Sequence, residues 1–164
     1  MNKQDDGQNL QSKPVPKKII TSQASFEPQI NENISTRMVK KIDKLSALKE
    51  YKTRDLVEDS EELGRELSKK LKTTQIRKFL DAVNRLKAQL ADKGFTEEIK
   101  SELILLRPKL AYAAARQPGS MDSLQQVLEA AIKKVEDDPD NFKRFVQLIE
   151  SIIAYHKASG GREQ

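Results

Sequence analysis

Two basic stripes carry the side chains of this sequence that are suited to binding chemistry. In the first, Lys109, Tyr112 and Arg116 follow one another at steps of three and four residues, which places cation, ring and cation along one helix edge. Such a row suits a nucleic-acid backbone, with phosphates on the cations and a base stacked on the ring. A structural interpretation is equally open, in which Tyr112 closes the edge of a core and the two cations extend past it to solvent.

The second stripe lies earlier in the chain and is also spaced for one helix face. Its members, at steps of four, three and four residues, and the cations that flank them are Thr74, Lys78, Asp81 and Arg85, with Lys72, Arg77 and Lys87. Asp81 stands four residues before Arg85 and can pair with it, so an ordinary solvent face is the alternative. Residues 73–116 hold 9 basic and 5 acidic residues, an excess that can mark a nucleic-acid footprint.

No motif of a known catalytic or metal site accompanies these stripes. The 164 residues include no Cys and one His, which excludes disulfides, thiolate chemistry and multi-histidine metal sites. The acidic run at 136–140 lacks the glycine and distal glutamate of a calcium loop, so helix capping explains it better. His156 falls on an apolar helical arc, where a packed side chain is expected. We therefore expect neither enzymatic activity nor a cofactor.

The elements that must position both stripes are helices. Apolar residues recur at three- and four-residue steps from about residue 34 to 160, and sustained β alternation is absent. The sequence predicts an all-α bundle of five to six helices over residues 34–161. Residues 1–33 are polar, and their few apolar side chains have no period, so a disordered tail is expected.

Three positions qualify the helical pattern. Ser35 is a plausible N-cap of the first helix, whose apolar stripe continues to Leu48. Gly64 weakens the second helix by about 1 kcal/mol relative to alanine. Pro108 removes a backbone donor from the fourth helix, which is expected to kink or restart there.

The hydropathy pattern indicates a protein of the cell interior. No apolar run reaches the roughly 18 residues that a membrane span needs, and the polar N-terminus has no apolar signal-peptide region. We expect a soluble, cytoplasmic protein that makes no membrane contact.

Three segments, at residues 73–79, 106–116 and 154–161, together resemble the small helical subunit of type III-A CRISPR–Cas effectors, the Csm complex. Residues 73–79, TTQIRKF, are similar to its "TSQIRK/N" segment. Residues 106–112, LRPKLAY, followed by Ala114, Ala115 and Arg116, are similar to its "LRxKLxY…GR" segment, although Ala115 stands where the family often has glycine. Residues 154–157 with Gly160 and Gly161 fit the family's end, and the likeness covers about residues 53–161.

The resemblance implies a non-catalytic subunit whose copies stack as a filament beside the CRISPR RNA–target RNA duplex, while other subunits of the effector complex cut. Base pairing then supplies sequence specificity, and the protein contacts the backbone. The expected nucleic-acid contacts are Lys72, Thr74, Gln75, Arg77, Lys78, Arg85, Lys109, Tyr112 and Arg116. Two other interpretations remain: a helical adaptor that binds protein without nucleic acid, and a nucleoid-type DNA binder that acts alone.

Overall fold

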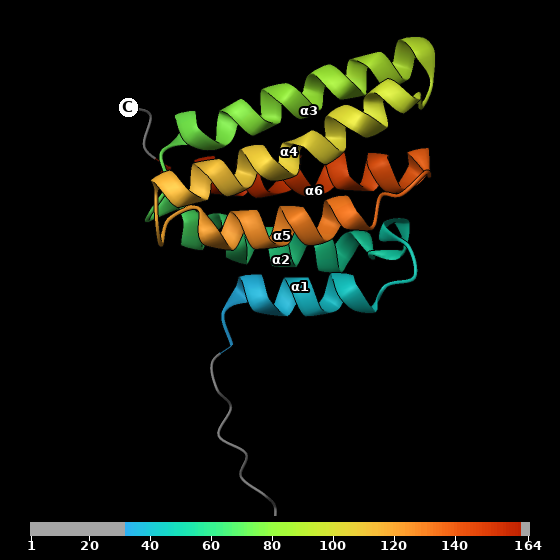
Figure 1. The fold of residues 1–164 in the computed structure, drawn as a ribbon. Coiled ribbons are helices and arrows are strands. Elements are labelled where there is room, and N and C mark those ends of the chain that lie inside the picture. Colours follow the sequence, from blue (N-terminus) through green and yellow to red (C-terminus); the bar gives the residue numbers. More distant parts are fainter. Residues whose placement is uncertain (1–31, 162–164) are drawn as a thin grey trace, which may run out of the picture. The chain divides into compact units, whose positions relative to one another are not determined.

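The computed structural model describes residues 32–161, and it confirms the all-α prediction. This part of the chain holds six α-helices and one 3₁₀ helix, with no β-strand among its residues. In chain order the elements are α1 (Ile34–Lys44), η1 (Leu48–Glu50), α2 (Thr53–Ser68), α3 (Thr73–Lys93), α4 (Glu97–Arg116), α5 (Asp122–Lys133) and α6 (Pro139–Ala158) (Figure 1). The expected tail of residues 1–33 lies outside the described residues except for Glu32 and Asn33.

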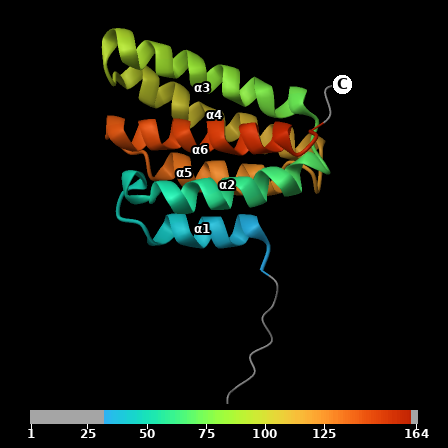
Figure 2. The same cartoon turned by 180° about the vertical axis from the view of Figure 1, so that it is seen from behind.

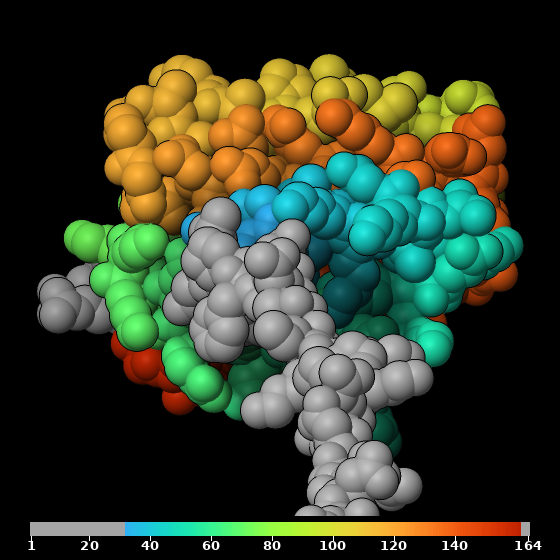
Figure 3. All heavy atoms as spheres, turned by 90° about the horizontal axis from the view of Figure 1, so that it is seen from below, coloured from blue at the N-terminus to red at the C-terminus, as the bar shows by residue number. Residues whose placement is uncertain are grey.

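The helices form two layers of three. α4, α5 and α1 make up the layer nearer the viewer in Figure 1, and α3, α6 and α2 make up the layer that Figure 2 shows from behind. On the face drawn in Figure 3, α5 lies between α4 and α1. The core between the layers is built from aliphatic and phenylalanine side chains, and none of the described helices is long and apolar enough to cross a bilayer. At one end of this arrangement α3 and α4 pair with each other.

Gly64 marks a very close approach between α2 and α6. A Cβ atom at this position would lie 2.7 Å from the backbone nitrogen of His156 and 2.8 Å from the carbonyl oxygen of Ile152. The residue that weakens α2 as an isolated helix therefore allows two helix backbones to pack against each other.

His156 is fully buried in α6, as its place on the apolar arc predicted. Its Nε2 lies 3.0 Å from the carbonyl oxygen of Leu71. Because a carbonyl only accepts, Nε2 carries the proton and donates it to this bond. The side chain is thus a packing residue that ties the end of α6 to the segment before α3.

The helix starts confirm that the acidic run at 136–140 caps a helix, and they correct the prediction for Ser35. Asp138 caps α6, with Pro139 as its first residue, and Thr96 caps α4 by accepting the Ile99 N–H at 3.4 Å. Ser35 is not the N-cap of α1, because Asn33 accepts the Ser35 N–H at 3.1 Å and Ser35 itself is buried within the helix.

The first apolar stripe is divided between two elements rather than carried by one helix to Leu48. α1 ends at Lys44, and the next residue, Leu45, has extended backbone angles. Leu48 reaches the core from the 3₁₀ helix η1 instead. The spacing of the apolar residues survives this break, which is why periodicity alone did not reveal it.

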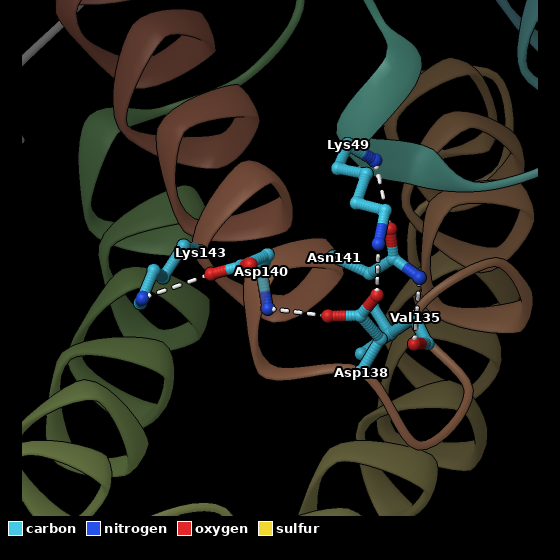
Figure 4. Close-up of polar contacts among 6 residues, drawn as sticks. All are labelled: Lys49, Val135, Asp138, Asp140, Asn141 and Lys143. Carbon is cyan, nitrogen blue, oxygen red and sulfur yellow. Dashed lines mark hydrogen bonds and ion pairs between the residues drawn. The ribbon is translucent and has the colours of Figure 1, made fainter.

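The acidic run at 136–140 caps a helix, as predicted, and it also forms ion pairs that were not predicted (Figure 4). Asp138 accepts the Asp140 N–H at 2.8 Å and pairs with Lys49 Nζ at 2.6 Å. This hydrogen bond from Lys49 lowers the pKa of the Asp138 carboxyl and raises the pKa of Lys49. Asn141 accepts the Lys49 N–H at 2.8 Å, and Lys143 pairs with Asp140 at 2.9 Å. Within residues 32–161 no group of three or more metal-ligating side chains occurs.

Candidate nucleic-acid interface

A groove of about 620 Å³ lies between α3 and α4 and gathers most of the predicted contact residues. Six of the nine line it: Gln75, Lys78 and Arg85 from α3, and Lys109, Tyr112 and Arg116 from α4. Apolar side chains complete the lining: Phe79, Ala82, Leu106, Ala113 and Met121. Helical spacing predicted each row separately, and the antiparallel pairing of α3 with α4 brings the two rows together.

Tyr112 stands at the surface of this groove with 65% of its area exposed. Arg116 donates to the Tyr112 hydroxyl at 3.4 Å, and its guanidinium carbon lies 5.6 Å from the ring centroid. The interpretation in which Tyr112 closes the core edge is therefore wrong. α4 runs without interruption from Glu97 to Arg116, so Pro108 does not restart the helix and the predicted row is preserved.

Arg85 reaches the groove from α3 but pairs across it. Its guanidinium lies 3.1 Å from Glu102 of α4, so the predicted pair with Asp81 inside α3 is wrong. Arg85 pairs with Glu102 because α4 runs directly alongside α3. Arg85 thereby links the two walls, and the charge that it brings to the groove is partly neutralised.

The other three cations of the groove have no such partner. Within residues 32–161, Lys78, Lys109 and Arg116 make no ion pair with a carboxylate. Three uncompensated positive charges along one groove raise the local potential and attract a polyanion. All three side chains are exposed, so phosphate oxygens can replace the water molecules around their charged groups.

Lys72, Thr74 and Arg77 lie outside the lining of the groove, although all three are exposed. Lys72 is the residue before α3, and its backbone N–H donates to Gln75 Oε1 at 2.9 Å. Sequence spacing assigned these three residues to the second stripe or its flanks. Helical periodicity gives only an approximate direction for each side chain, so it does not locate the boundary of a groove. Their contact with nucleic acid stays a prediction.

Gln117 is a groove residue that sequence reasoning missed. In the sequence, Gln117, Pro118 and Gly119 together are typical of the end of a helix. In the structure it follows the last residue of α4, lines the groove and accepts a hydrogen bond from Gln75 Nε2. No local signal marked it, because consecutive helical residues are about 100° apart and Gln117 therefore does not continue the row of Arg116.

The side of α4 that faces α5 has a different character. Ile104 on this side is 57% exposed. Leu105 is 54% exposed, but helical spacing places it on the row of Lys109, Tyr112 and Arg116. Ile104 lines a smaller groove of about 340 Å³ together with Arg107, whose buried Nε has no hydrogen-bond partner. Pro108 has no N–H to offer the carbonyl oxygen of Ile104, one turn earlier. Ile104 is therefore an exposed aliphatic side chain near a buried polar atom that has no partner within the described residues.

Comparison with known proteins identifies a family model and a curated protein that this chain resembles. Residues 50–162 match the family model described as Csm2 Type III-A. A curated protein of Streptococcus thermophilus, "CRISPR system Cms protein Csm2", is 32% identical over 95 residues, which cover 57% of this chain and 76% of the relative. No solved structure matches the chain significantly.

Proposed function

The chain belongs to the type III-A Csm2 family of CRISPR small subunits, and from this premise we propose that it binds the backbone of target RNA through the groove between α3 and α4. It acts without sequence specificity, as a non-catalytic cytoplasmic component of the effector complex. Its copies stack as a filament alongside the CRISPR RNA–target RNA duplex and next to the other subunits.

The observation that carries the RNA-binding part is the convergence of six predicted contact residues on one groove. They come from two helices, and three of the groove's four cations lack a carboxylate partner among the described residues. Cations that fold stability does not require are available for phosphates, and phosphate contacts position a strand without reading its bases. A basic groove is therefore suited to the backbone of a target strand whose sequence is already read by pairing with the guide.

The stacking part is supported by the other side of α4. Ile104 is one of two exposed large aliphatic side chains of the described region, and it lines a small groove together with Arg107, whose Nε has no partner there. A neighbouring subunit that covers this edge would remove apolar area from water, at about 25 cal/mol per Å². One helix would then bind RNA on one side and protein on the other.

A photocrosslinking experiment in the assembled effector complex tests both parts together. p-Benzoylphenylalanine replaces either Tyr112 or Ile104, two exposed positions on the same helix that serve as matched controls for each other. We expect position 112 to crosslink radiolabelled target RNA and position 104 to crosslink a neighbouring protein subunit. RNA crosslinked at 104 and not at 112 would contradict the assignment of the groove.

Crosslinks to protein alone at both positions would instead support the adaptor interpretation. The non-catalytic part has its own test, because the purified chain should leave labelled RNA intact in Mg²⁺ or Mn²⁺. Cleavage that disappears when Asp138 and Asp140 are both replaced by alanine would overturn it.

A further inference from the structure

We propose that the groove between α3 and α4 is a nucleobase pocket, so that its ligand is RNA with at least one unstacked base. This inference rests on the proposed function, because it assumes that RNA occupies the groove. It adds that the groove holds a base as well as phosphates, and that a regular base-paired strand does not fill it.

The first support is a chain of side-chain amides whose orientation is determined by its first member. The Lys72 backbone N–H can only donate, so the oxygen of the Gln75 amide must face it, at 2.9 Å. The NH₂ group of Gln75 is then turned toward Gln117, whose oxygen accepts from it. The NH₂ group of Gln117 is left as a donor without a partner among the described residues.

This donor belongs to a side chain that lines the groove. Because the oxygen of the Gln117 amide is bound to Gln75, the NH₂ group is held in place. It can donate to the carbonyl oxygen or ring nitrogen on the edge of a base. A phosphate oxygen would not need it, since three unpaired cations already line the same groove. Nothing in the sequence pattern predicted this donor, since it depends on a contact between residues 42 positions apart.

The second support is the exposed aromatic ring of Tyr112, which lines the groove together with apolar side chains such as Phe79 and Leu106. Phosphates gain nothing from an aromatic ring, whereas a planar base gains stacking and apolar contact. Arg116 covers one side of the Tyr112 ring, and no second ring or cation of residues 32–161 stacks on it. The volume of about 620 Å³ lies within the range of small-molecule pockets, roughly 300–1,000 Å³.

Two hexamers with equal charge separate base binding from phosphate binding. The full-length chain is titrated with a uridine hexaribonucleotide and with a hexamer of abasic ribose phosphates, and the side-chain amide signal of Gln117 is followed by NMR. A Gln117→Glu variant assigns the signal. Removal of the bases should weaken binding by about 5- to 150-fold, the range for the loss of one stacked base. The Gln117 amide signal should shift with uridine and stay in place with the abasic hexamer.

Variants keep the test specific to the pocket. In Tyr112→Ala the two hexamers should differ by less than about twofold, whereas Asn84→Ala, at an exposed position of α3 that does not line the groove, should keep the full difference. Equal, salt-dependent binding of both hexamers by the wild type would overturn the base pocket and leave the proposed function standing. Tighter binding of a blunt RNA duplex than of the uridine hexamer would also overturn it. No binding of any probe at millimolar concentration would overturn the proposed function as well.

Discussion

The contact between α2 and α6 and the groove between α3 and α4 are both made by paired helices, yet they differ in what lies between the backbones. At the first, Gly64 has no side chain and the helices meet within van der Waals distance. At the second, long polar side chains line an open space of about 620 Å³. The difference separates a surface that holds the fold together from one that is available to a ligand.

The charges of the two regions differ in the same way. Around α6 several cations pair with carboxylates of the chain, namely Lys49 with Asp138, Lys143 with Asp140 and Lys87 with Glu150. In the groove, Arg85 alone of the four cations has a carboxylate partner within residues 32–161. Counting cations therefore reveals less about binding than asking which of them the fold has already paired.

The largest effect is expected for a substitution at the contact between α2 and α6. Gly64→Ala places a methyl group within 3 Å of backbone atoms of α6, which cannot move aside as a side chain can. Alanine gains about 1 kcal/mol of helix propensity, but overpacking should outweigh it and lower the free energy of unfolding by about 3 kcal/mol. Urea denaturation measures the change, with Asn84→Ala on the exposed face of α3 as a control. A more stable Gly64→Ala protein would show that α2 and α6 are farther apart than described.

Substitutions in the groove between α3 and α4 should change RNA binding rather than the stability of the fold. Replacing Lys78, Lys109 and Arg116 by alanine removes three phosphate contacts, so the slope of log K against log salt for single-stranded RNA should fall by about 2. That slope corresponds to about a hundredfold weaker binding at 0.1 M salt. Fluorescence anisotropy across a salt series measures both quantities.

A matched control removes the same charge from the paired cations. The variant with Lys49, Lys100 and Lys143 replaced by alanine loses three positive charges that carboxylates of the chain already neutralise. Its salt slope should stay near that of the wild type. Equal loss of slope in both triple variants would mean that net charge, and not the groove, binds RNA.

A smaller effect is expected at a buried hydrogen bond between η1 and α2. Tyr51 is 1% exposed, and its hydroxyl donates to Asp59 Oδ2 at 2.5 Å, the oxygen that Lys41 also contacts. Burial and the Asp59 carboxylate both raise the pKa of Tyr51. Tyr51→Phe leaves Asp59 paired with Lys41, so unfolding should become easier by about 1 kcal/mol, with RNA binding unchanged. Chemical denaturation and the same anisotropy titration check the two halves of this prediction.

The smallest effect concerns pH. The hydrogen bond from Lys49 lowers the pKa of Asp138, so this pair stabilises the fold above the unfolded value of about 3.9 and ceases to do so as pH falls below it. Asp138→Asn keeps a capping side chain but removes the charge. Its melting temperature should be slightly below that of the wild type at pH 7 and equal to it near pH 2. A difference that persists in acid would assign the effect to the cap and not to the ion pair.

Local signals predicted the helices well because their caps and stops are short-range chemistry. Asp138 with Pro139 and Thr96 mark helix starts that the structure confirms, and Gly94 ends α3 with a positive φ. Leu45 shows the limit of this approach, since a break that keeps the apolar spacing is invisible to periodicity. The role of Gly64 is likewise unreadable without α6, which lies about 90 residues later.

The sequence predicted the candidate site as two separate rows of side chains. It did not predict that the two rows would line the same groove. Arg85 pairs with Glu102 rather than with Asp81 because α4 comes alongside α3, a tertiary fact. Arg77 belongs to the predicted stripe but lies outside the groove. Gln117 enters the site through its bond with Gln75, which no local pattern contains.

The two-layer arrangement also has a consequence for the order in which the newly made chain acquires its structure. α3 and α4 are neighbours in sequence as well as in space, so their hairpin closes a short loop. α1 packs on α5 and α2 packs on α6, pairs whose hydrogen bonds join residues as far as 91 positions apart. During synthesis the apolar faces of α1 and α2 must therefore wait for the last helices to leave the ribosome. The walls of the groove are complete before the middle of the protein can close.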